Sequence, residues 1–155
     1  MSNPVGYLSV AVKRANSDIW EQITSFQHNT FTNAGRDLAH AQMYTNTSAG
    51  TRGAGFVAVS ADTGTPAAGD TSLTGEIATG GLTRADATTK THSAGTNTST
   101  VQHTFTASSA HTAVHKAALF NASSGVTMAH AAVFSSDVTL AINDQLQVTF
   151  TLTLG

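Results

Sequence analysis

The chain has 155 residues, no cysteine, only 10% charged residues and a formal net charge of −2. This length suits one domain built around one hydrophobic core. Because the sequence has no cysteine, disulfides, thiolate metal sites and thiol nucleophiles are excluded. The near-neutral charge disfavours nucleic acid as a partner, since phosphate binding needs a basic surface.

The apolar residues form no run near the length of about 20 that spans a membrane, and the start lacks the pattern of a secretory signal. We therefore expect a chain that is made in a cytoplasm and has no membrane partner. An average protein has about 25% charged residues, and in this chain threonine, alanine, serine and glycine take their place. A surface of hydroxyls and methyls is easier to desolvate than a charged one, so this composition favours wide protein–protein contacts.

The first half of the chain predicts two strands and one helix. Residues 6–13 alternate large apolar with small or polar side chains, which indicates a strand with one buried face. The apolar stretch from Ile19 to Phe26 is compatible with a strand or a short helix. Asn33 is a good N-cap for a helix over residues 33–44. The segment 45–55 is typical of a loop, and the run FVAVS at 56–60 predicts a short strand.

The composition and spacing of the second half of the chain are typical of β-strands. Residues 61–81 predict a loop, in which Asp70 caps a short helical turn that reaches Ile77. Further strands are predicted at residues 83–93, 99–107, 112–121, 127–134 and 145–154. The last run alternates strictly between apolar and polar residues. We expect a mainly β, antiparallel, sandwich-like single domain at 18–155 with one short helix at about 33–44. Residues 1–17 are expected to form an N-terminal strand or arm, which could pair with a neighbouring subunit.

The sequence offers no convincing catalytic or metal-binding motif. The segment 53–58 fits a dinucleotide fingerprint, but it follows a polar loop and runs into a strand, where a helix is required. Of the seven histidines, only His111 and His115 have a ligand-like spacing, and they fall in a predicted strand. The serines of residues 123–125 suit a hairpin turn. We therefore predict no enzymatic activity, no catalytic residue, no cofactor and no metal.

Five residues are candidates for protein–protein contacts. The aromatic candidates include Trp20, the one tryptophan, which is interpreted either as a core anchor or as an interface anchor. The two arginines are chosen because charge is scarce in this chain. A solvated position or an intrachain ion pair explains them equally well. The candidates are Tyr7, Trp20, Arg36, Arg52 and Phe56.

Several segments, taken in order, resemble a family of small virion proteins encoded by tailed phages. The resemblance covers most of residues 18–155, and no single segment is catalytic. The segments are WE at 20–21, HNTFTNAGRD at 28–37, FVAVS at 56–60, TPAAGDT at 65–71, KAALFNASSG at 116–125, MAHAAVF at 128–134 and the terminal strand.

This resemblance implies a structural role in the virion. Members of the family are capsid decoration proteins or tail- and fibre-associated proteins. Of these roles we expect capsid decoration: binding to the outer capsid surface, with the major capsid protein as partner, to bridge neighbouring subunits and stabilise the head. Self-association, as a homotrimer, is also expected. The alternative is a tail- or fibre-associated protein with a structural or receptor-binding role.

Overall fold

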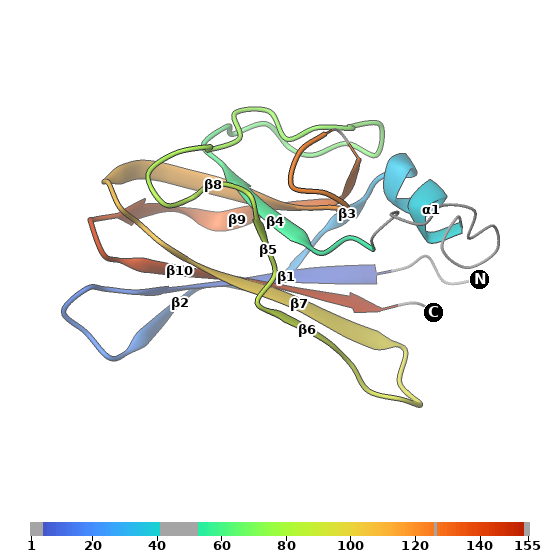
Figure 1. The fold of residues 1–155 in the computed structure, drawn as a ribbon, viewed down its shortest axis with the longest axis horizontal. Coiled ribbons are helices and arrows are strands. Elements are labelled where there is room, and N and C mark those ends of the chain that lie inside the picture. The colour runs from blue at the N-terminus through green and yellow to red at the C-terminus, as the bar shows by residue number, and fades with distance from the viewer. Residues whose placement is uncertain (1–4, 41–52, 126, 154–155) are drawn as a thin grey trace.

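The computed structural model describes residues 5–40, 53–125 and 127–153, and these form two antiparallel sheets and one short helix. In Figure 1 the two sheets lie one above the other as a sandwich, which confirms the predicted fold class. The elements are β1 Val5–Lys13, β2 Trp20–His28, β3 Thr30–Phe31, α1 Asn33–His40, β4 Phe56–Ser60, β5 Ala85–Asp86, β6 Thr89–His92, β7 Thr98–Thr106, β8 His111–Phe120, β9 Met128–Leu140 and β10 Gln145–Thr153.

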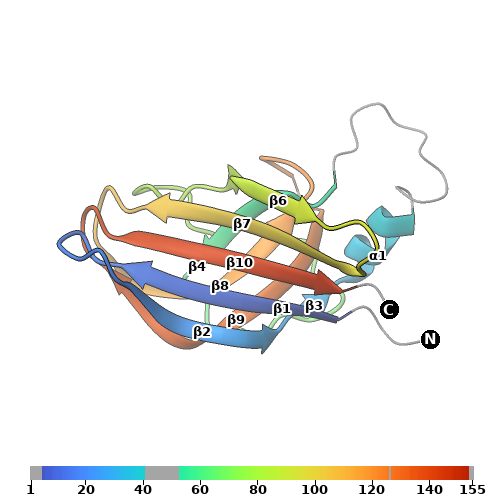
Figure 2. The ribbon, with the colours of Figure 1, turned by 90° about the horizontal axis from the view of Figure 1, so that it is seen from below.

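The first sheet, sheet A, has the order β2-β1-β10-β7-β6, and Figure 2 shows it from its outer side. Strand β1 pairs with β10 from Val5↔Thr153 to Lys13↔Gln145, and its other edge pairs with β2. Residues 5–13 of the N-terminal segment therefore form an interior strand of the chain's own sheet. Because β1 and β10 are antiparallel, the first and last described residues are direct neighbours.

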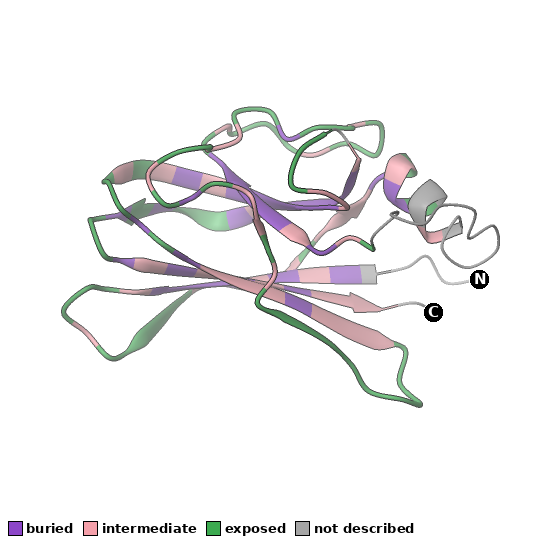
Figure 3. Ribbon diagram, viewed as in Figure 1, coloured by how far each residue is buried: buried purple, intermediate pink, exposed green. Residues whose placement is uncertain are grey.

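The core lies between the two sheets and follows from the alternation of the strands. In β10 the side chains of Leu146, Val148 and Phe150 are fully buried, while the residues between them are partly exposed. In β1 the buried positions are Leu8, Val10 and Val12. Figure 3 shows this as buried segments that alternate with partly buried ones along the strands. Burial of aliphatic and aromatic side chains is the main stabilising contribution to such a fold.

The second sheet, sheet B, has the order β3-β9-β8-β4-β5, and residues 61–83 cross its outer side (Figure 1). A second, smaller apolar cluster lies under this segment and includes Leu73 and Phe120. The helical turn predicted for residues 70–77 is not present. The segment instead has turns, such as the one closed by the Glu76 amide on the Leu73 carbonyl oxygen, and one isolated bridge between Ser60 and Glu76, and the Ile77 amide donates to Val59 of β4.

Helix α1 begins where predicted, although its N-cap is one residue earlier. The Thr32 hydroxyl accepts a hydrogen bond from the Gly35 amide at 3.0 Å, so Thr32 rather than Asn33 has the capping role. A side chain at Gly35 would come within 2.4 Å of the Ala129 carbonyl oxygen, so only glycine allows the helix to approach β9 this closely. The predicted last turn, residues 41–44, lies outside the described residues.

The ambiguous apolar stretch is a strand, β2, at the edge of sheet A. Relative to β1 it carries extra residues at two irregularities of the register. Phe26 lies at one of them with φ of 55°, a left-handed conformation that is strained for an aromatic residue. Thr24 points inward, and its hydroxyl accepts a hydrogen bond from the amide of Ser135 in β9 at 2.9 Å. This contact joins the two sheets along the β2 side.

Candidate functional site

One end of the sandwich is held together by a buried carboxylate. Asp144 lies in the β9–β10 turn and is 3% exposed. Its Oδ1 accepts a hydrogen bond from the amide of Ala15 at 2.9 Å, and its Oδ2 accepts from the Ala141 amide at 2.9 Å and from Arg14 at 2.8 Å. Its carbonyl oxygen accepts from the amide of Ala107 at 2.9 Å. The β1–β2, β7–β8 and β9–β10 turns are therefore fixed to one residue.

The charge of Asp144 is maintained by these contacts. Burial alone disfavours a carboxylate, but the hydrogen bonds from Ala141, Arg14 and Ala15 outweigh it and lower the pKa of Asp144 below its ordinary value. Arg14 also donates to the carbonyl oxygen of Thr139 at 2.6 Å. The guanidinium thus joins the end of β9 to the end of β1.

Large apolar side chains are exposed on these fixed turns and at the start of β2. Ile19 is 76% exposed, Trp20 38% and Ile142 57%. The β1–β2 and β9–β10 turns lie at the same end of the molecule, on the left in Figures 1 and 2, away from the described chain ends. We call Ile19, Trp20 and Ile142 the apolar end. Exposed apolar groups on a fixed backbone are typical of protein-binding surfaces.

The outer side of sheet A forms a second surface, which we call the hydroxyl face. Residues of β7 and β10 alternate between the core and the outer side of the sheet. Every position that faces outward in these two strands is threonine or glutamine. In β1 the outward positions are Tyr7, Ser9, Ala11 and Lys13, since their neighbours are buried. The outward residues of β10 and β7 are Gln145, Gln147, Thr149, Thr151, Thr153, Thr98, Thr100, Gln102, Thr104 and Thr106.

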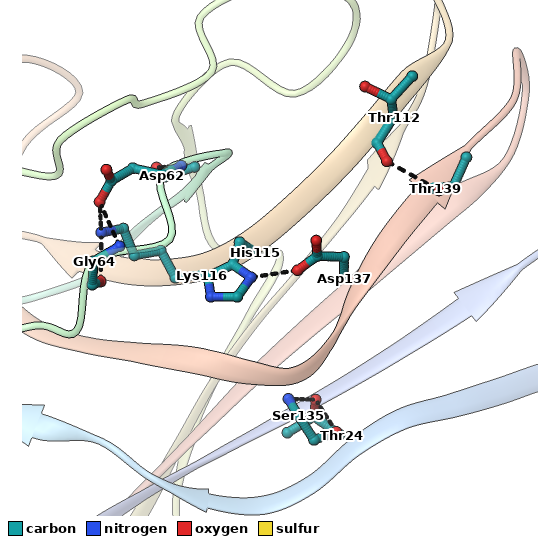
Figure 4. Close-up of polar contacts among 10 residues, drawn as sticks. Thr24, Asp62, Gly64, Thr112, His115, Lys116, Ser135, Asp137 and Thr139 are labelled. Carbon is teal, nitrogen blue, oxygen red and sulfur yellow. Dashed lines mark hydrogen bonds and ion pairs between the residues drawn. The ribbon is translucent and has the colours of Figure 1, made fainter.

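Sheet B, in contrast, carries charged groups that are paired within the chain. Figure 4 shows the buried Lys116 on β8 donating to the Asp62 carboxylate and to the Gly64 carbonyl oxygen, the latter at 2.9 Å. The bond from Lys116 lowers the pKa of Asp62 below its ordinary value. His115 and Asp137 form a further hydrogen-bonded pair across β8 and β9 (Figure 4). These side chains are already satisfied by partners in the same chain.

Two histidines on inward-facing strand positions are partly or largely buried. His130 on β9 stacks on Phe31, with ring centroids 4.5 Å apart, and burial lowers the pKa of His130 to about 4. The pKa of His103 is also lowered, mainly by desolvation. Within residues 5–40, 53–125 and 127–153, no group of three or more metal-ligating side chains comes together. In the same ranges, the only helix is too short to cross a membrane.

The structure brings two of the five predicted contact residues to one surface. Tyr7 and Trp20 both lie on the outer side of sheet A, Tyr7 in β1 and Trp20 opposite Lys13. Arg36 is exposed on α1, whereas the ring of Phe56 packs on the second apolar cluster inside the chain. Arg52 lies outside the described residues. Tyr7 and Trp20 therefore remain the candidates that the fold places on a common surface.

Three exposed apolar residues were not among the sequence candidates. Ile19 follows the turn residues 16–18, and Ile142 opens the turn that ends in Asp144. Phe26 is 76% exposed and meets the ring of Tyr7 edge-on at 6.2 Å. The available signal was an apolar residue beside a turn, since such a residue has few neighbours to bury it.

No protein-family model matches the chain, and a search of curated proteins finds no match.

Proposed function

We propose that this chain is a non-enzymatic structural protein of a tailed-phage virion, which binds the outside of the capsid and bridges neighbouring major capsid subunits. Its sequence segments resemble such virion proteins, and its low charge suits a surface that other proteins cover. The observation that carries the proposal is the apolar end, where Ile19 and Ile142 are exposed on turns fixed by Asp144 and Trp20 is partly exposed at the start of β2.

The apolar end has the properties of a pre-formed contact. Complete burial of one aliphatic side chain contributes about 1.5–3 kcal/mol, so a few such residues are sufficient for a useful contact. Because Asp144 already orders the turns, little conformational entropy is lost when they bind. A protein that binds only the assembled shell stabilises the shell by its binding free energy, and capsid symmetry repeats the contact many times.

The location in the particle is tested on purified virions of the phage that encodes the chain. Gel densitometry gives the copy number, and micrographs of particles labelled on this protein give its position. Capsid decoration predicts a copy number on the order of hundreds and label over the head, because each shell repeats the site. A few dozen copies or fewer, or label over the tail, contradicts capsid decoration and supports the tail- or fibre-associated alternative.

The contact itself is tested with capsids that lack the protein. Ile19→Ser together with Ile142→Ser is expected to reduce occupancy of the capsid at a fixed protein concentration by about tenfold or more, since two apolar anchors are lost. Phe26→Ser is the matched control, because Phe26 is as exposed as Ile19 but lies near the opposite end of β2. Equal occupancy for the double variant and the control would exclude the apolar end as the capsid contact.

A further inference from the structure

The hydroxyl face has almost no charge. Among the described residues of its five strands, only Lys13 has a charged side chain on the outer side. Lys13 is the last residue of β1, and its Nζ lies 3.5 Å from Oδ1 of Asp18. Glu21 and Lys90 belong to the same sheet, but they stand opposite Val12 and Val101, which point inward. Two copies of this face can therefore approach each other without bringing like charges together.

The polar groups of the face complement themselves. A threonine hydroxyl and a glutamine amide each donate and accept hydrogen bonds, so a face built from them offers partners to its own copy. The long side chains are already ordered across the sheet. Gln102 donates to the Thr149 hydroxyl at 2.9 Å, and Gln147 donates to the Thr104 hydroxyl at 3.4 Å. Ordered side chains lose less entropy when a partner covers them.

The face also has a suitable size. Four strands of nine residues and one of four, spaced about 4.8 Å apart at about 3.3 Å per residue, cover about 640 Å². A standard interface buries about 800 Å² on each partner. Tyr7 and Trp20 lie on the β1–β2 side of the face and supply the aromatic groups that such interfaces favour.

From this combination we infer that the hydroxyl face binds the same face of a second copy of the chain, with the two copies related by a twofold axis. The inference goes beyond the proposed virion role and does not depend on it. A threefold assembly joins two different patches of each subunit, whereas this face matches itself. Ile19 and Ile142 lie on turns rather than in the sheet, so these two residues of the apolar end stay available in the pair.

The test measures the mass of the full chain in solution by sedimentation equilibrium and light scattering. The wild-type protein is expected at twice the 15.9 kDa of one chain. Thr149→Glu, at the centre of the face, is expected to weaken self-association by about tenfold or more, because each pair then buries two like charges. Thr112→Glu places the same residue at an exposed strand position of sheet B and is expected to leave the mass unchanged.

A mixing experiment makes the test independent of any folding defect. Thr149→Lys is expected to impair pairing as Thr149→Glu does, and an equimolar mixture of the two variants is expected to restore the mass of a pair, since the charges are now opposite. A wild-type monomer, a trimer, or a pair that survives Thr149→Glu would overturn the inference. So would a mixture that stays monomeric, because a face that pairs with itself must respond to opposite charges.

Discussion

Asp144 accepts hydrogen bonds from three groups with one carboxylate: Ala15, Ala141 and Arg14. In Asp144→Asn one oxygen becomes an amide that donates, so at least one of these donors faces another donor. We predict a loss of about 2–3 kcal/mol in the free energy of unfolding, measured in urea. Asp18→Asn is the control and should change it by less than about 0.5 kcal/mol, because Asp18 is fully exposed. An Asp144→Asn protein as stable as this control would show that the network contributes little.

His130 should make stability depend on pH below neutrality. Its pKa is about 4 in the folded chain against an ordinary value of 6.5, so the unfolded state binds the proton first as pH falls. The contribution of neutral His130 to the free energy of unfolding is complete above pH 6.5, and it decreases toward pH 4 by about 3 kcal/mol in total. The free energy of unfolding, measured in urea at several pH values, should depend less steeply on pH in His130→Phe. This variant keeps an aromatic ring against Phe31. An unchanged slope in this variant would assign the dependence to other groups.

Among the elements, the segment over sheet B depends on Arg84. Its guanidinium donates to Glu76 through two nitrogens, at 2.9 and 2.5 Å, and lies 3.5 Å above the centre of the Phe120 ring. A third nitrogen donates to the carbonyl oxygens of Ala122 and Gly125. Lysine cannot reproduce this planar arrangement of donors.

We therefore predict that Arg84→Lys lowers the free energy of unfolding by about 2 kcal/mol and speeds hydrogen exchange in residues 61–83. Exchange in β1 and β10 should change less, because these strands lie on the other side of the core. Lys90→Gln is the control, since the Lys90–Asp86 pair is exposed and should contribute little. Equal exchange in both variants would contradict the role given to Arg84.

The elements also show what the sequence could and could not predict. The final run alternates strictly, so β10 and its buried side were predictable. The length of β9 was not, because its register with β8 shifts by several residues between Val114↔Val138 and Lys116↔Val133, which breaks the alternation. In β2 only Thr24 is buried, so apolar spacing could not distinguish strand from helix.

The candidate surfaces were predictable only in part. The turn at Asp144 could be predicted from the residues around it, but its contact with Ala15 joins positions 129 residues apart. Local patterns carry no information on such pairing. Tyr7 was among the contact candidates predicted from the sequence, whereas the hydroxyl face could be found only once the pairing of β1, β10 and β7 was known.

At the scale of the whole molecule, the two surfaces imply different contacts. The hydroxyl face is broad and polar, and we assign it to a second copy; the apolar end is small and belongs to the proposed capsid contact. The sequence analysis predicts a homotrimer, which the twofold pairing does not produce, so the measured mass separates the two assemblies. A twofold axis parallel to the strands would place both apolar ends on the same side of the pair, where a bivalent contact with the shell is tighter than either contact alone.

The neighbouring positions of Val5 and Thr153 have a practical consequence for engineering. A peptide or second protein attached before β1 or after β10 would leave the domain at one place, remote from Ile19 and Ile142 (Figure 2). Cargo displayed through either terminus should therefore leave the opposite tip unobstructed. The same closeness would allow the ends to be joined by a short linker and the chain to be opened at another loop, as in circular permutation.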